Sequence, residues 1–124
     1  MKTDLSEIRE TLQNMLTRHT PPLRVRRQSA ENFEVAGTKE TMQGKQKVDG
    51  YYFASVMPKS KDVRFYYFPI YTHADQFAGI SEELRKCLKG KSCFHIKKLS
   101  PGLESEITEM IEKGVAIYLA DGLI

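Results

Sequence analysis

The chain has 124 residues, of which 40% are apolar and 28% charged, a composition typical of one globular domain that excludes a disordered or collagen-like chain. It has no long unbroken apolar run, no apolar signal core and too few cysteines for a disulfide framework, so we expect a cytoplasmic protein with no membrane partner. The formal net charge of +3 is too small to indicate nucleic acid by itself, and we expect no nucleic-acid partner.

The first predicted element is an amphipathic helix over about residues 4–18. Asp4 is suited to cap its N-terminus, and Glu7 stands at the spacing of a capping box. Pro21 and Pro22 prevent the helix from continuing, because proline lacks the amide proton that a helix needs. The apolar side of the helix consists of Leu5, Ile8, Leu12, Met15 and Leu16.

The next segment, from residue 23 to residue 47, has a weaker pattern. It predicts two short strands at 23–27 and 32–36, followed by a polar loop at 37–47. Lysines and arginines outnumber acidic residues here, and we interpret them as a solvated charged surface.

The strongest local signal predicts a β-hairpin in the middle of the chain. Two aromatic and β-branched runs at 50–57 and 63–68 flank a polar linker at 58–62. If the whole linker forms the turn, Met57 lies opposite Val63 and alternate side chains share a face. The uncharged face, which we expect in the core, contains Phe53, Met57, Val63, Phe65 and Tyr67. The opposite face contains Tyr52, Ala54, Val56, Arg64, Tyr66 and Phe68.

The last third of the chain predicts a helix, a strand and a second long helix. Pro69 ends the hairpin, and Ser81 is a credible N-cap for a short helix over 81–89. Residues 92–97 alternate as a strand does, and Ser100 with a following proline begins a final helix that runs to about residue 121. We therefore predict a two-layer α+β fold, an antiparallel sheet with a central aromatic hairpin packed by the N- and C-terminal helices.

Motifs of common enzymes are absent from the sequence. Gly90, Lys91 and Ser92 resemble the end of a phosphate-binding loop, but that motif requires glycine where Arg85 stands. No spacing pairs a cysteine nucleophile with a histidine base. We expect a non-enzymatic protein without a cofactor.

A metal site has only weak candidates. Cys93 and His95 are two residues apart on a predicted strand and so project from one face, where Cys87 or His73 would have to complete the ligand set. Unpaired cysteine is more often a buried apolar residue, so we expect no metal.

The candidate ligand-binding residues are Tyr52, Arg64, Tyr66 and Phe68, on the second face of the hairpin. Tyrosine supplies contact area at low entropic cost and a guanidinium pairs with an anion, so this face suits a small anionic or aromatic ligand or a protein partner. Alternatively, the loop at 37–48 covers this face, or a second copy of the chain does. The second case would make the protein a homodimeric structural domain without a ligand.

Three sequence runs carry a family resemblance. Residues 52–56, 63–71 and 83–99, with Gly90-Lys91-Ser92-Cys93-Phe94-His95-Ile96-Lys97-Lys98-Leu99 in the last, resemble the YdhG-like family, domain of unknown function 1801, over about residues 48–122. The resemblance implies a compact α+β domain that is bacterial and intracellular. It also implies an alternative function, because some members are described as frataxin-like iron chaperones. Chaperones of this kind hold iron weakly on exposed carboxylates, and the nearest equivalents in this chain are Glu104, Glu106, Glu109 and Glu112.

Overall fold

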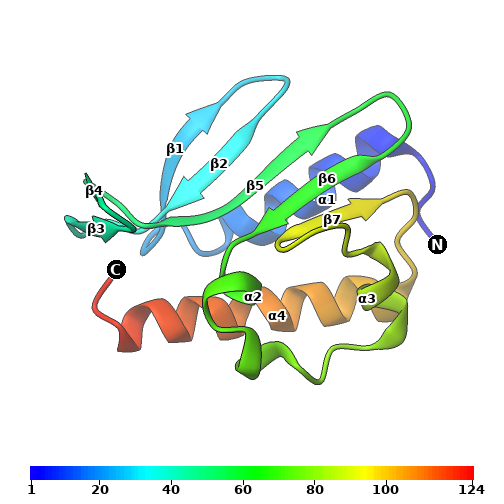
Figure 1. Cartoon of the computed structure of the whole chain (residues 1–124). Helices are drawn as coiled ribbons and strands as arrows, with labels where there is room; N and C mark the ends of the chain where they lie inside the picture. Colours follow the sequence, from blue (N-terminus) through cyan, green and yellow to red (C-terminus); the bar gives the residue numbers. More distant parts are fainter.

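The computed structural model describes residues 1–124 and has the predicted α+β fold (Figure 1). Its main sheet is antiparallel, with five strands in the order β1-β2-β5-β6-β7. The helices are α1 (Leu5–Thr17), α2 (Pro69–Thr72), α3 (Glu82–Cys87) and α4 (Pro101–Ala120), with a 3-10 helix η1 (Ala74–Phe77). The strands are β1 (Arg24–Gln28), β2 (Phe33–Ala36), β3 (Thr41–Gln43), β4 (Gln46–Val48), β5 (Tyr52–Pro58), β6 (Val63–Tyr67) and β7 (Cys93–Ile96). None of the helices combines the length and the apolar character needed to cross a bilayer.

All three predicted N-caps are present. The side chain of Asp4 accepts a hydrogen bond from the backbone N–H of Glu7 at 3.0 Å. The hydroxyls of Ser81 and Ser100 accept from the N–H groups three residues later, each at 3.1 Å. These bonds satisfy backbone donors that have no partner inside a helix, which is why short polar residues mark the helix starts.

The terminal helices share one hydrophobic core with the inner face of the sheet, the face that carries Val63, Phe65 and Tyr67. Phe65 pairs with Val56 on one side and Phe94 on the other, so three strands place apolar side chains side by side. Figure 1 shows α1 running behind β5 and β6, in agreement with its contacts to these strands. The fully buried members contributed by the helices include Ile8, Leu12, Leu16, Ile107, Ile111 and Tyr118.

The register of the hairpin differs from the prediction by one residue. Pro58 lies opposite Val63, so the turn contains only residues 59–62 and Met57 lies opposite Arg64. Because side chains alternate along a strand, Met57 joins the outer face, the face that carries Arg64 and Tyr66, and is only half-buried. The prediction that Met57 belongs to the core face is therefore wrong.

The same shift places Ala54 and Val56 on the inner face, where both are fully buried, and not on the outer face as predicted. Phe53 nevertheless stays in the core as predicted. The reason is a β-bulge: Val35 pairs with Ala54 while the next residue of β2 pairs with Tyr52, which leaves Phe53 as an extra residue in β5. The bulge therefore allows Phe53 and Ala54 to point inward together and returns Tyr52 to the outer face.

Helix α4 approaches the sheet most closely at Gly114. A Cβ atom at this position would lie 2.1 Å from the hydroxyl oxygen of Tyr67, a distance that real Cβ atoms do not reach. The Tyr67 hydroxyl donates a hydrogen bond to the carbonyl of Met110 at 2.6 Å. The ring of Phe53 packs edge-on against both Tyr67 and Tyr118. Glycine is therefore required here by space and not by an unusual backbone angle.

The segment predicted as a loop at 37–47 is mostly a second, two-stranded sheet. Strands β3 and β4 pair in an antiparallel hairpin that turns at Gly44, whose φ of 64° is in the region that favours glycine. The residues just before this hairpin bind the C-terminal tail, because the Leu123 carbonyl accepts from the N–H groups of Thr38 and Lys39. In Figure 1 this hairpin lies at the opposite end of the molecule from α3.

Residues 69–88 lie between β6 and β7 in the chain and contact both the main sheet and α4. Phe77 in η1 packs edge-on against Tyr67, and the Ser81 N–H and hydroxyl both donate to the carboxylate of Glu106 on α4. Helix α3 ends two residues before the predicted position, because Leu88 adopts an extended conformation and forms a bridge with Phe94. This bridge holds α3 beside β7 at the edge of the sheet.

Candidate functional site

The structure places Tyr52, Arg64 and Tyr66 on the outer face, as predicted from alternation along the hairpin. Arg64 pairs with His95, and Tyr66 pairs with Cys93 and Ser55 on its two sides. Phe68 directly follows β6. The predicted residues thus form a row along the outer face, and its two ends differ in structure.

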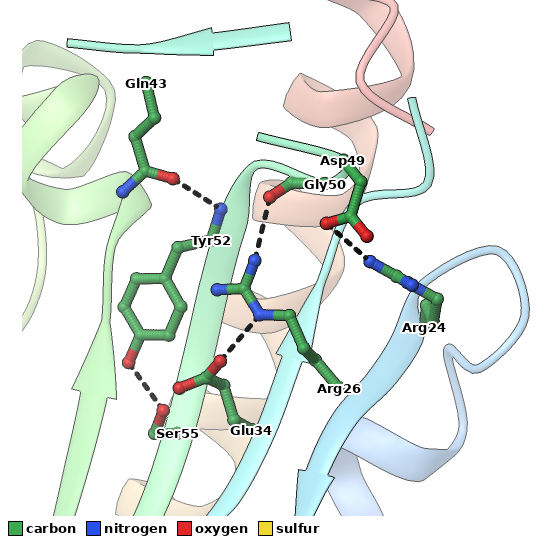
Figure 2. A network of polar contacts seen from close by, with 8 residues as sticks. All are labelled: Arg24, Arg26, Glu34, Gln43, Asp49, Gly50, Tyr52 and Ser55. Atoms are coloured by element: carbon green, nitrogen blue, oxygen red, sulfur yellow. Dashed lines mark hydrogen bonds and ion pairs between the residues drawn. The ribbon is translucent and has the colours of Figure 1, made fainter. Parts of the chain in front are cut away.

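At one end of this row, all polar groups of Tyr52 bind other atoms of the chain (Figure 2). Its hydroxyl donates to Ser55 at 2.7 Å, its backbone N–H donates to the side chain of Gln43 at 3.2 Å, and its carbonyl accepts from the Tyr118 hydroxyl. The guanidinium of Arg26 lies 6.0 Å from the ring centre and is itself paired with Glu34 at 2.7 Å. Burial raises the pKa of Tyr52 above its ordinary value. Tyr52 therefore links β5 to β3 and to α4.

Phe68 belongs to an aromatic cluster next to Tyr52. Its ring lies 5.6 Å from Tyr51, 5.5 Å from Tyr52 and 5.8 Å from Tyr71, centre to centre. These are the separations of ordinary packed aromatic pairs. The ammonium group of Lys91 lies 5.3 Å from the Tyr71 ring, at the exposed margin of the cluster.

At the other end of the row, Arg64 contacts a buried carboxylate. The Arg64 Nε donates to Asp62 Oδ1 at 3.3 Å, and the other carboxylate oxygen lies 3.5 Å from the Nδ1 atom of His95. The side chain of Asp62 is only 8% exposed. A charged group buried to this degree needs such partners, so Arg64 and His95 keep Asp62 in place.

Asp62 and His95 line the largest cavity of the molecule, about 600 Å³ in volume. Four parts of the chain converge there: the turn before β6, helix α3, the end of β7 and the start of α4. We call it the lysine-lined cavity. Its walls are formed by Asp62, Glu83, Lys86, Cys87, Lys89, His95, Lys97, Lys98 and Leu103.

The four lysines of this cavity have no carboxylate partner. Lys86, Lys89, Lys97 and Lys98 take part in none of the ion pairs of the chain. Glu83 lies in the same wall, but its two carboxylate oxygens accept from the Ser100 hydroxyl, each at 3.3 Å. Four lysine side chains thus line one hollow against two carboxylates, one of which is paired with Arg64, and this excess of positive charge creates a positive local potential.

The lysines were absent from the predicted site, although the sequence contains a signal for them. Residues 82–98 carry six lysines and arginines against two glutamates, an excess larger than the net charge of the whole chain. Charge density alone does not distinguish a solvated surface from a binding site. The fold adds that four of these cations surround a single cavity.

The weak metal candidates do not come together. Cys93 and His95 share the outer face, but Cys93 is beside Tyr66 and His95 is beside Asp62. Burial raises the pKa of Cys93, which opposes formation of the thiolate that binds metal. His73 is bound elsewhere, to Asp121 at 2.9 Å. No three His, Cys, Asp or Glu side chains form a group suited to a metal ion.

Two further hollows lie along α4. One, of about 240 Å³, lies between α4 and the segment around Phe77. The other, of about 490 Å³, is an acidic surface with Glu104, Glu109 and Glu112 in its lining, and the carboxylate of Glu104 is paired with Lys2 at 2.7 Å. None of the four predicted ligand-binding residues lines either hollow or the lysine-lined cavity.

Comparison of the chain with protein-family models, curated proteins and solved structures finds no match. Membership of the YdhG-like family therefore stays a prediction from the sequence.

Proposed function

We propose that this protein is a non-enzymatic binding domain that holds a small anionic ligand in the lysine-lined cavity. The observation that carries the proposal is the convergence of four unpaired lysines on one hollow. Like charges held close together repel one another, and an anion bound among them removes that repulsion.

The size of the cavity supports a small molecule as the ligand. Its volume of about 600 Å³ falls within the range of roughly 300–1,000 Å³ that is typical of small-molecule sites. The cavity also lies where the outer face meets α3, so the proposal keeps the anionic ligand expected from Arg64 and changes its location. Arg64 acts as a positioning residue, because its guanidinium holds the Asp62 carboxylate in the cavity wall.

A titration with inorganic pyrophosphate tests the proposal. We expect calorimetry at low ionic strength to detect binding by the full chain. In a Lys97→Gln/Lys98→Gln variant the affinity should fall by at least about tenfold, because two charge-assisted contacts are lost. Absence of heat at millimolar pyrophosphate would reject anion binding.

A matched variant separates a site from a general effect of charge. Lys39→Gln/Lys45→Gln removes the same number of charges from exposed residues, which lie before and within the β3–β4 hairpin at the far end of the molecule. We expect this variant to bind pyrophosphate as the unmodified chain does. An equal loss in both variants would show that the overall charge, and not the cavity, attracts the anion.

Neither the iron-chaperone nor the homodimer alternative is favoured by a contact in the structure, and both stay predictions. Two of the four glutamates named for iron bind other groups of the chain, because Glu104 pairs with Lys2 and Glu106 accepts from Ser81.

A further inference from the structure

The kind of cation in the lysine-lined cavity indicates which class of anion fits it best. All four unpaired cations are lysines, and no arginine lines the cavity. Arginine presents a planar fork that matches a carboxylate, whereas lysine is a compact point charge that approaches an anion from many directions. Several lysines therefore suit a compact tetrahedral group such as a phosphoryl group better than a planar carboxylate.

The balance of charge indicates how many charges the ligand carries. The Asp62 carboxylate is already paired with Arg64, so four lysines against the Glu83 carboxylate leave an excess of about three positive charges, without counting His95. A phosphate monoester carries about −1.5 to −2 charges near neutral pH, so this excess is enough to balance it. A more highly charged polyanion would also meet the carboxylates of Asp62 and Glu83.

These two carboxylates have acceptor capacity left for a ligand. A carboxylate offers about four lone-pair positions. Asp62 has one partner on each oxygen, the Arg64 Nε at 3.3 Å and the His95 Nδ1 at 3.5 Å, and Glu83 accepts from a single hydroxyl, that of Ser100. Hydroxyl groups on the body of a ligand can donate to the remaining positions. Among anions of similar charge, the carboxylates therefore favour one that carries hydroxyl groups over one that does not.

The remainder of the wall fits an organic body. Leu103 is buried in the core and Cys87 is half-buried. Burial raises the pKa of the Cys87 thiol, so this side chain is neutral near neutral pH and contributes a weakly polar surface. The cavity has room for a group much larger than a phosphate ion.

We infer that the ligand is a phosphate monoester whose organic body carries free hydroxyl groups, as in sugar phosphates and nucleoside monophosphates. The phosphoryl group lies among the lysines, and the hydroxyl groups donate to Glu83 and Asp62. This inference rests on the proposed function and makes it more specific.

A panel of probes of similar charge tests the ligand class by calorimetry. Methyl phosphate is a monoester without hydroxyl groups, and succinate has two carboxylates in place of a phosphate. We expect glucose 6-phosphate, adenosine monophosphate or both to bind at least about tenfold more tightly than either, because each added hydrogen bond to a charged group contributes to affinity. The tighter of the two identifies the source of the hydroxyl groups.

A Glu83→Gln variant should change the affinities for the two kinds of probe in opposite directions. Loss of a negative charge should strengthen the binding of methyl phosphate, whereas the hydroxyl-bearing monoester should bind at least about threefold more weakly, because a charge-assisted bond becomes a neutral one. Glu83 is exposed, so the variant is expected to fold.

The outcomes separate this inference from the proposed function. If methyl phosphate or succinate binds as well as the hydroxyl-bearing monoesters, the ligand class is wrong while anion binding stands. If Glu83→Gln weakens all probes alike, the role of the carboxylate is wrong. If neither pyrophosphate nor any probe of the panel binds, or if Lys97→Gln/Lys98→Gln leaves every measured affinity unchanged, the proposed function fails as well.

Discussion

At the inner face of the sheet the hydroxyls of Tyr67 and Tyr118 donate to backbone carbonyls, whereas in the lysine-lined cavity four ammonium groups have no partner within the chain. Buried polar groups that are paired stabilise a fold, and unpaired charges around a hollow do not. The contacts that stabilise the fold and the cavity that we propose as the binding site therefore lie in different parts of this small domain. Substitutions should therefore separate them.

The largest expected effect is at the closest contact of the inner face. Gly114→Ala places a methyl group against the hydroxyl of Tyr67 and the ring of Phe53, neither of which has room to move. We expect the free energy of unfolding to fall by about 3 kcal/mol, from overpacking and from damage to the Tyr67–Met110 hydrogen bond. Urea denaturation measures the change.

Gly102→Ala is the matched control in the same helix. Nothing lies near the position that its Cβ would occupy. Because alanine favours helix over glycine, this variant should be unchanged or more stable by up to about 1 kcal/mol. If the two variants were equally stable, the close approach of α4 to the sheet would be wrong.

A second prediction concerns alkaline pH. Burial raises the pKa of Tyr52, Tyr67 and Tyr118 above the ordinary value of about 10. The folded chain therefore keeps these protons at a pH at which the unfolded chain releases them. Their stabilising contribution is complete below about pH 10 and is lost as the pH rises further, by up to about 1.4 kcal/mol per pH unit for each tyrosine.

Tyr67→Phe isolates one of these groups. At neutral pH the variant should be less stable by about 1 kcal/mol, because the hydrogen bond to the Met110 carbonyl is lost. Above about pH 10 its stability should decline less steeply than that of the unmodified chain, because one fewer buried phenol is coupled to unfolding. Denaturation at several pH values from about pH 9 to about pH 11, roughly one unit on either side of the ordinary pKa of tyrosine, measures this decline. If the free energy of unfolding fell equally steeply with pH in both proteins, the burial of this hydroxyl would be contradicted.

Much of the inner face was predictable from the sequence, because it depends on local patterns. Asp4, Ser81 and Ser100 cap helices through bonds to residues three positions away, and Phe65 and Tyr67 reach the core by simple alternation. The register of the hairpin was not predictable, since a turn of four residues and one of five are both compatible with the same linker. A change of one residue in the turn moved four side chains of β5, residues 54–57, to the opposite face.

The lysine-lined cavity depends on packing between distant segments. Lys86 and Lys97 are eleven positions apart in the sequence, and they line the same hollow because Leu88 pairs with Phe94 and holds α3 beside β7. No periodic pattern in the local sequence predicts that bridge. The predicted residue Tyr52 shows the same limit, because the β-bulge places it on the outer face and its bonds to Gln43 and Ser55 arise only in the folded chain.

The smallest expected effect on stability is at the cavity. Lys97→Gln/Lys98→Gln should change the free energy of unfolding by no more than about 0.5 kcal/mol, because both side chains are exposed and neither has an ion-pair partner. Any change should be a gain at low ionic strength, since two charges are removed from a crowded positive region, and it should disappear as salt screens the repulsion. Thermal unfolding at two salt concentrations measures both. A loss comparable to that of Gly114→Ala would mean that these lysines support the fold, and the division between a stabilising inner face and a binding cavity would then be wrong.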